Sequence, residues 1–332
     1  MKRHAFVVAL VAAAAVLAAG CNNDFRDCSD VDASAAEALP GLLSETGLYA
    51  DIAADVVVDE AIEFQPQYPL WTDGATKRRW LVLPPGGIVD TSNRDAWVFP
   101  VGTKFFKEFT RDSILLETRL NTLTPDGWTG VSYLWDEDGG DATRQLEVAE
   151  DVKGTNHDIP SAVQCLACHG GRGNFSLGFS STQLSLETRQ ELSDAGVLSQ
   201  PVTAALALDP SAEAGLGALH GNCAHCHNDE RDEAPLATTC YDPSADDDDD
   251  DEPIDFTLPP DLASVEAAPA VQTARWQLGD LDDSNLLDRV STRNLSLADD
   301  ASMPPLGTEI VDDDTVAALE AFIAALPPRG DR

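Results

Sequence analysis

Two short motifs carry the residues best suited to chemistry in this chain. Each reads Cys-x-x-Cys-His, at residues 165–169 and again at residues 223–227. Two thiols at this spacing can add to the two vinyl groups of one porphyrin, and the histidine that follows can bind the iron. The motifs therefore predict two covalently bound c-type haems with His169 and His227 as proximal iron ligands. The four attachment residues are Cys165, Cys168, Cys223 and Cys226.

A zinc site is the main alternative for two cysteine pairs. Zinc takes four thiolates, or a mixture of thiolates and imidazoles, in a closed tetrahedron. The gap between the pairs at 165–168 and 223–226 is far longer than the roughly 15–20 residues of a zinc ribbon. Zinc also has no need of a histidine directly after each pair, so the pattern favours haem.

Met303 is the candidate sixth ligand for the haem on His227. The chain has two methionines, and Met1 belongs to an expected leader. A lone methionine commonly fills a gap in a core. Here Met303 precedes Pro304 and Pro305, which stiffen the loop, and a final helical segment follows. Methionine ligation raises the potential of a haem, so the second haem is expected to be the high-potential one.

The haem on His169 is left without a methionine. His225 lies inside its own motif and has to point away from its own haem. His157 and His220 are therefore the candidates for the sixth position. Each is equally well explained as a hydrogen-bonded surface residue or a propionate contact, and a five-coordinate iron is the third alternative.

Residues 1–20 have the features of a targeting segment. A basic start is followed by an apolar run too short for a comfortable membrane span. The run ends Leu-Ala-Ala-Gly-Cys, which resembles a bacterial lipobox and predicts cleavage before Cys21 and a lipid on its thiol. A plain secretory signal and an uncleaved anchor are the alternatives. In an oxidising compartment Cys28 and Cys240 are able to form a disulfide, although the sequence does not decide it.

Composition indicates a globular, exported and strongly acidic protein. The 332 residues carry a net charge of −37 and are 43% hydrophobic, which allows sizeable cores. Such a surface repels nucleic acid and anionic lipid but suits a basic redox partner. Asn22 after the lipobox cysteine favours the periplasmic face of the outer membrane or the cell surface.

The fold expected from these patterns is α+β, with an antiparallel β-sandwich-like domain followed by an all-α dihaem region. Short segments of mixed β-branched, aromatic and alternating polar residues predict strands, and turn residues separate them. The predicted strands are 61–67, 77–83, 96–99, 103–110, 113–120, 128–135 and 143–148.

Helices are expected after residue 156. Segments 185–195, 210–222, 284–290 and 312–326 carry helical patterns, and the last has an apolar stripe that would pack on the helix before Cys223. The chain is divided into five predicted parts. They are a leader at 1–20, a tether with short helices at 21–50, a β-rich domain at 51–152, a first haem segment at 153–209 and a second haem domain at 210–332 with an acidic insertion at 241–260.

A basic patch interrupts the acidic sequence at Lys77, Arg78 and Arg79. Such residues bind the carboxylates of a haem propionate or of an anionic substrate. They also occur on edge strands, where they discourage aggregation. Both interpretations are retained.

Five segments together resemble a bacterial family of dihaem c-type cytochromes with a β-rich N-terminal region. They are WTDGATKR at 71–78, WVFPVGT at 97–103, QCLACH at 164–169, NCAHCHN at 222–228 and MPPLGT at 303–308. The resemblance runs from about Leu43 to Leu326, and the first two segments are its specific part. It implies a redox function and supplies no substrate.

The leading functional hypothesis is an electron carrier between periplasmic or surface redox proteins, anchored to the membrane by lipid. The alternatives are a peroxidase-like dihaem enzyme with the first haem as the reactive centre, and a β-domain binding module with a redox tail. The state of the iron on His169 separates the first two.

Overall fold

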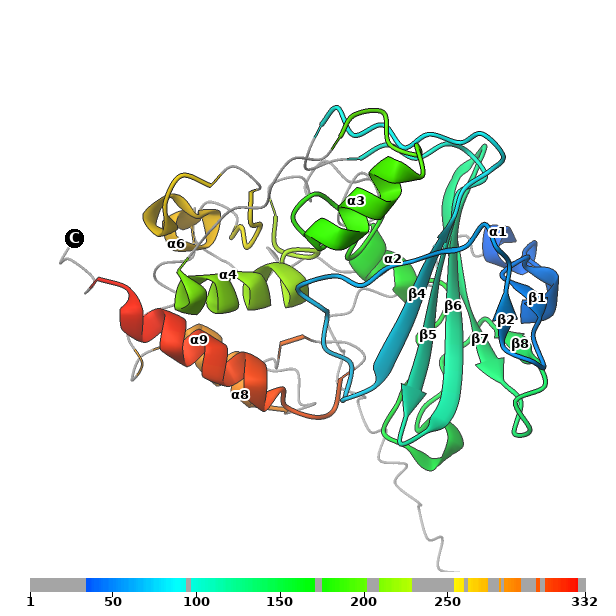
Figure 1. The fold of residues 1–332 in the computed structure, drawn as a ribbon. Coiled ribbons are helices and arrows are strands. Elements are labelled where there is room, and N and C mark those ends of the chain that lie inside the picture. The colour runs from blue at the N-terminus through cyan, green and yellow to red at the C-terminus, as the bar shows by residue number, and fades with distance from the viewer. Residues whose placement is uncertain are drawn as a thin grey trace, which may run out of the picture.

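The computed structural model describes residues 34–93, 97–170, 175–201, 209–228, 254–259, 262–273, 281, 284–293, 303–304 and 308–327. The expected leader, Cys21, Cys28, Cys240 and most of the acidic insertion lie outside these residues. The predicted α+β class is confirmed, with an N-terminal antiparallel sheet followed by a mostly helical region (Figure 1). Among the described residues, no helix combines the length and apolar character needed to cross a bilayer.

The central element is one antiparallel sheet of six strands, in the order β3-β4-β5-β6-β7-β8. Each strand pairs with the next in sequence, as expected where short turns link alternating strands. A separate two-stranded sheet, β1 with β2, lies beside it. The bounds are β1 Tyr49–Asp51, β2 Val56–Val57, β3 Ile62–Glu63, β4 Thr76–Val82, β5 Lys104–Arg111, β6 Ile114–Thr124, β7 Gly127–Trp135 and β8 Ala142–Gln145.

Six of the seven predicted strands are confirmed as β3 to β8, with boundaries shifted by a few residues. The predicted strand at 96–99 does not form at residues 97–99, the part of it that the structure describes. Val98 makes only an isolated antiparallel bridge to Asp90, and its side chain is 62% exposed. A strand needs neighbours along its length, and this loop has one pair.

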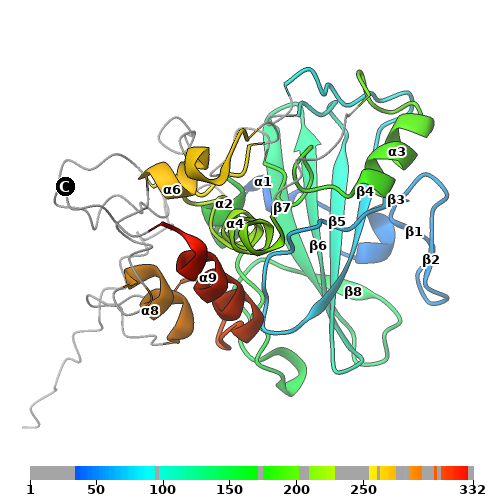
Figure 2. The same cartoon turned by 60° about the vertical axis from the view of Figure 1, so that its left-hand side comes forward.

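The two faces of the sheet meet different partners because successive side chains alternate. Trp80, Phe106 and Leu120 lie on the face covered by α1, β1 and β2 (Figure 1). The opposite face is turned towards the helical region, with α2, α3 and α4 on that side in both views (Figures 1 and 2). This second face is where the haem motifs lie.

The helices follow the predicted pattern closely. Ser284 and Asp312 cap α8 and α9 by accepting backbone N–H groups of Leu287 and Thr315, each at 3.2 Å. The bounds are α1 Ser34–Glu37, α2 Gln164–His169, α3 Leu186–Asp194, α4 Pro210–Asn222, α6 Pro269–Thr273, α8 Asn285–Ser291 and α9 Asp313–Ala325, with 3₁₀ turns at Leu43–Glu45, Val152–Gly154 and Val265–Ala267.

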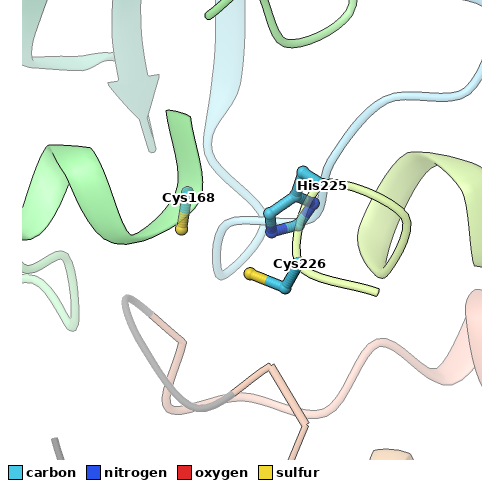
Figure 3. A group of neighbouring side chains, drawn as sticks. All are labelled: Cys168, His225 and Cys226. Atoms are coloured by element: carbon cyan, nitrogen blue, oxygen red, sulfur yellow. The ribbon is translucent and has the colours of Figure 1, made fainter. Parts of the chain in front are cut away.

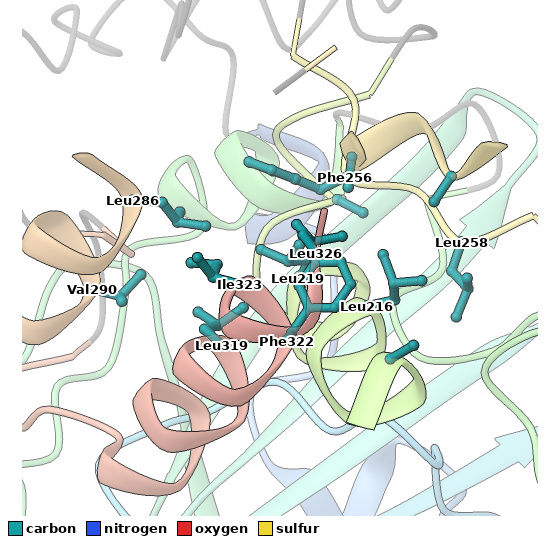
Figure 4. Packing of buried hydrophobic residues seen from close by; sticks show 14 of the residues in the cluster. Leu216, Leu219, Phe256, Leu258, Leu286, Val290, Leu319, Phe322, Ile323 and Leu326 are labelled. Carbon is teal, nitrogen blue, oxygen red and sulfur yellow. The ribbon is translucent and has the colours of Figure 1, made fainter. Parts of the chain in front are cut away.

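The prediction that the last helix packs on the helix before Cys223 is confirmed. Leu216 and Leu219 of α4 meet Phe322 and Ile323 of α9 in one buried cluster (Figure 4). Gly215 allows the close approach, because a Cβ there would collide with the ring of Phe322. The α4–α9 pair fixes the direction in which the second haem motif leaves α4.

Candidate haem centre

The first motif is delivered by the short helix α2. Ser161 begins it, with its hydroxyl accepting the N–H of Gln164 at 3.2 Å while the Gln164 side chain accepts the N–H of Ser161 at 3.0 Å. This reciprocal pair satisfies donors at the helix start. Cys165 follows directly and is 8% exposed, and His169 is the last residue of the helix. The two thiols and the imidazole thus come from successive turns of one element.

The second motif begins where α4 ends. The chain winds on for another turn, because the N–H groups of Cys226 and His227 both bond to the carbonyl of Cys223, at 3.0 and 2.9 Å. Cys223 and Cys226 are therefore one turn apart, as the attachment of a single porphyrin requires. The ring of His227 packs edge-on against Phe256 with centroids 5.5 Å apart.

The two motifs meet. The sulfurs of Cys168 and Cys226 and a ring nitrogen of His225 all lie within 4.8 Å of one another (Figure 3). His225, set aside in the sequence because it had to point away from its own haem, points towards the first motif. No disulfide joins the four motif cysteines, all of which are free thiols.

Burial keeps these thiols protonated. It raises the pKa of Cys165 to about 11 and that of Cys223 to about 12. The pKa of Cys168 is raised by its hydrogen bond to Cys226 and by burial. A nucleophilic or redox-active cysteine needs a lowered pKa. These environments suit a sulfur held as a neutral thioether.

His169 is oriented as a metal-ligating histidine. Its Nδ1 lies 2.9 Å from the carbonyl of Phe175, so Nδ1–H donates there. Ligating histidines typically donate their second nitrogen to a carbonyl or carboxylate, which leaves the lone pair of the other nitrogen for the metal. The amide nitrogen of Asn121 lies beside the ring, 3.2 Å from Nδ1 and 3.3 Å from Nε2. Burial and the charge of Lys107 lower the pKa of His169 to about 3, which keeps the ring neutral.

Met303 packs on the same apolar cluster as Cys223. Its N–H donates to the carbonyl of Arg289 at 3.0 Å, and its carbonyl accepts from the Arg293 guanidinium at 2.9 Å. The backbone of Met303 is thus fixed to α8 and the residues after it. This placement is compatible with its predicted role as sixth ligand on the second haem.

The segment 71–74 ties the sheet to both halves of the second haem site. The carboxylate of Asp73 accepts the N–H groups of Glu309 and Ile310 at 2.8 to 3.0 Å. The indole of Trp71 donates to the carbonyl of Ile310 at 3.0 Å, and its backbone N–H donates to Asn222, the residue before Cys223, at 2.7 Å. Asp73 has a φ of 46°, and Gly74, at 74°, occupies the left-handed region that glycine adopts readily. We call residues 71–74 the clamp turn.

His157 and His220 have other partners. His157 is 1% exposed, and its Nε2 lies 2.8 Å from the buried carboxylate of Glu117. His220 uses Nδ1 to accept the N–H of Leu258 at 3.0 Å, so its proton is on Nε2. In both rings the engaged atom has a structural role. Their ligation of the first haem stays a prediction.

Sequence reasoning overlooked a row of cations on the sheet face beside the first motif. Arg79, Lys107 and Arg119 are direct neighbours across β4, β5 and β6. Only Arg79 belonged to the predicted basic patch. β4 pairs with both β3 and β5 at residues 80 and 81, whereas the register pairs Lys77 and Arg78 of the patch with β5 alone, so the edge-strand interpretation stays open for these two residues. The alternation of Phe105, Lys107 and Phe109 in β5 was the available signal, because it puts a cation on an aromatic face.

Comparisons with known protein families, with curated proteins and with solved structures found no match to this chain.

Proposed function

We propose that this protein is an exported dihaem c-type cytochrome that relays electrons between redox proteins. Haem c attached at Cys165 and Cys168 has His169 as proximal ligand. Haem c attached at Cys223 and Cys226 has His227 and Met303 as its axial ligands. The haems supply the one-electron chemistry, and the chain supplies ligands, burial and charge. The family resemblance in the sequence points the same way.

The observation that carries the proposal is the contact between the motifs. Cys168 and Cys226, far apart in the sequence, have sulfurs within 4.8 Å of each other. Porphyrins attached to these two sulfurs necessarily lie close together. Two redox centres in one buried interface suit rapid internal electron transfer, whereas two isolated haems would serve separate reactions.

A zinc site explains less of the same arrangement. The group of Cys168, His225 and Cys226 offers three zinc ligands, and within the described residues no fourth one joins it. A structural zinc site is closed by four. Zinc would also leave Cys165 and Cys223 unused, whereas haem attachment uses every cysteine and the final histidine of both motifs.

The peroxidase-like alternative is favoured by one observation. His220 accepts an N–H group at Nδ1 and carries its proton on Nε2, so neither of its ring nitrogens offers a free lone pair to an iron on His169. A five-coordinate iron on His169 would bind small ligands and permit catalysis. The carrier is preferred because the cavity beside His169 is enclosed by bulky aromatic and cationic side chains.

The test is expression in a host that attaches haem c, followed by haem counting after alkaline pyridine treatment. Two haems per chain are expected, and one in each of the paired variants Cys165→Ala/Cys168→Ala and Cys223→Ala/Cys226→Ala. Zinc by elemental analysis without haem would refute the proposal. Carbon monoxide added to the reduced protein then separates the two functions, because a pure carrier does not bind it.

The proposal includes the localisation of the protein in the cell. Lipid on Cys21 would hold the protein at the membrane, on the periplasmic face of the outer membrane or at the cell surface. The net charge of −37 favours basic redox partners and disfavours nucleic acid. Labelling with radioactive palmitate, lost in Cys21→Ala, tests the anchor.

A further inference from the structure

The sheet face that is turned towards the haem motifs holds three cations in one row. The register pairs Arg79 of β4 with Lys107 of β5, and Lys107 with Arg119 of β6. Like charges directly opposite each other on one sheet face repel. Arg79 is only 4% exposed, and Lys107 and Arg119 are partly buried. Such an arrangement persists only where something compensates the charge.

The protein's own anions compensate the row in part. Arg119 bonds to the buried carboxylate of Glu117 at 2.5 Å, and His157 shares that carboxylate. Arg79 donates to the neutral amide oxygen of Gln65 at 2.7 Å. Lys107 has no hydrogen-bond or ion-pair partner among the described residues, and burial beside Arg79 and Arg119 lowers its pKa to about 7. One carboxylate therefore faces the three cations of the row, and Lys77 lies near them on the same face of β4, in a protein with a large excess of acid elsewhere.

The row borders the place where the first haem belongs. A cavity is lined by all three cations and by His169. Its other walls are mostly apolar and include Phe105, Phe175 and Leu177, with Asn121 and Ser176 as polar members. A second cavity shares Arg79 and Lys107 and reaches His225 of the second motif. Aromatic walls beside a cationic edge fit a flat apolar ring that carries two carboxylates.

We propose that Arg79, Lys107 and Arg119 bind the propionate carboxylates of the haem attached through Cys165 and Cys168. This inference rests on the proposed dihaem function. Arginine offers two parallel N–H donors to a carboxylate, and lysine offers a point charge. Two propionates bring two negative charges, which together with Glu117 balance the three cations. The β-rich domain is then one wall of the first haem site and not a separate binding module.

The row also sets the potential of that haem. Ferric haem carries one more positive charge than ferrous haem, so a cation held close to it in a medium of low dielectric constant favours reduction. Removing the charge of Lys107 should lower the potential of the His169 haem. The His227 haem, whose ligands come from α4 and the Met303 loop, should change less.

The experiment uses the full holoprotein and the variants Lys107→Gln, Lys107→Arg and Lys104→Gln. Lys104 lies on the same strand but bonds to the carbonyl of Thr46 on the other side of the sheet, so its variant is a matched control for lost charge. The readouts are the two midpoint potentials by spectroelectrochemistry and the propionate-bending band in the resonance Raman spectrum. Arg79→Gln is read in the same way should Lys107→Gln not accumulate.

The proposal is supported if Lys107→Gln lowers the potential of the first haem and shifts its propionate band. In Lys107→Arg both quantities should be close to their wild-type values, and in Lys104→Gln neither should change. This inference alone is overturned if the protein binds two haems and the propionate band is unchanged in both Lys107→Gln and Arg79→Gln. A wild-type chain that takes up no covalent haem overturns the proposed function together with it.

Discussion

Asp73 should decide whether the Met303 loop stays docked, and Asp73→Ala is the substitution that tests it. Its carboxylate is 3% exposed and accepts the backbone N–H groups of Glu309 and Ile310 at 2.8 to 3.0 Å. Met303 precedes these residues in the same loop. The loop depends on the clamp turn as well as on its own bonds to Arg289 and Arg293.

The loss in docking free energy of the Met303 loop follows from the two backbone N–H donors that Asp73 satisfies. A hydrogen bond to a charged group contributes about 1.5–3 kcal/mol, so two lost bonds weaken docking by about 3 kcal/mol or more. Every 1.4 kcal/mol is about a tenfold change in an equilibrium constant. The docked loop should therefore lose stability by about 100-fold. In Asp73→Asn, which keeps one acceptor oxygen, the docking stability of the loop should lie between that of Asp73→Ala and that of the wild type.

The assay is the Met–iron charge-transfer band of the oxidised protein during a urea titration. In Asp73→Ala the band should disappear at a lower urea concentration than the far-ultraviolet circular dichroism signal of the whole fold. The control is Asp59→Asn, because Asp59 is exposed and its side chain makes no hydrogen bond to the other described residues. A band in Asp73→Ala that survives to the same urea concentration as in the wild type would refute the role of the clamp turn.

Three further outcomes test other parts of the fold. Gly215→Ala should lower the free energy of unfolding by about 1–3 kcal/mol through a clash with α9, measured by thermal melting, while Gly41→Ala, with open space around it, should not. His157→Ala removes one of the two partners of the buried Glu117 carboxylate, Arg119 being the other, so stability should fall by about 1–3 kcal/mol. An unchanged electron paramagnetic resonance spectrum of the first haem would exclude His157 as its ligand. Burial raises the pKa of Glu108, so the folded state holds its proton more tightly than the unfolded chain and this contribution to stability is lost as the pH rises through the folded-state pKa. Glu108→Gln should therefore gain stability relative to the wild type from about pH 4 upwards, and a constant difference in denaturation midpoints would contradict this.

Local patterns predicted the elements well. The mixture of β-branched, aromatic and alternating polar residues in β4 to β7, with turn residues between the segments, identified each strand. The stripe of α9 correctly predicted its packing on α4. The segment at 96–99 misled because aromatic and β-branched residues also occur in loops that pack on a core, as Trp97 and Phe99 do here.

Contacts between residues far apart in the chain could not be predicted from the sequence. Nothing local indicates that Cys168 would meet Cys226, or that His225 would face the first motif. Lys107 was missed because a single lysine in a strand reads as solvent-facing until the packing of the other face is known. Asp73 was recognised as part of a motif, but its hydrogen bonds run to a loop near the other end of the chain.

The buried contact between the motifs has a consequence for the order of assembly. Cys165 is buried and Cys223 is partly buried in the finished fold, and burial raises the pKa of both thiols. A ligase that joins vinyl groups to these sulfurs needs a chain that has not yet closed. If the chain carries haem as proposed, attachment would precede the closing of the interface between the two motifs, and each porphyrin would be a template on which that interface forms. A chain deprived of haem would reach the compact state by a separate route, with its two cysteine pairs already out of reach.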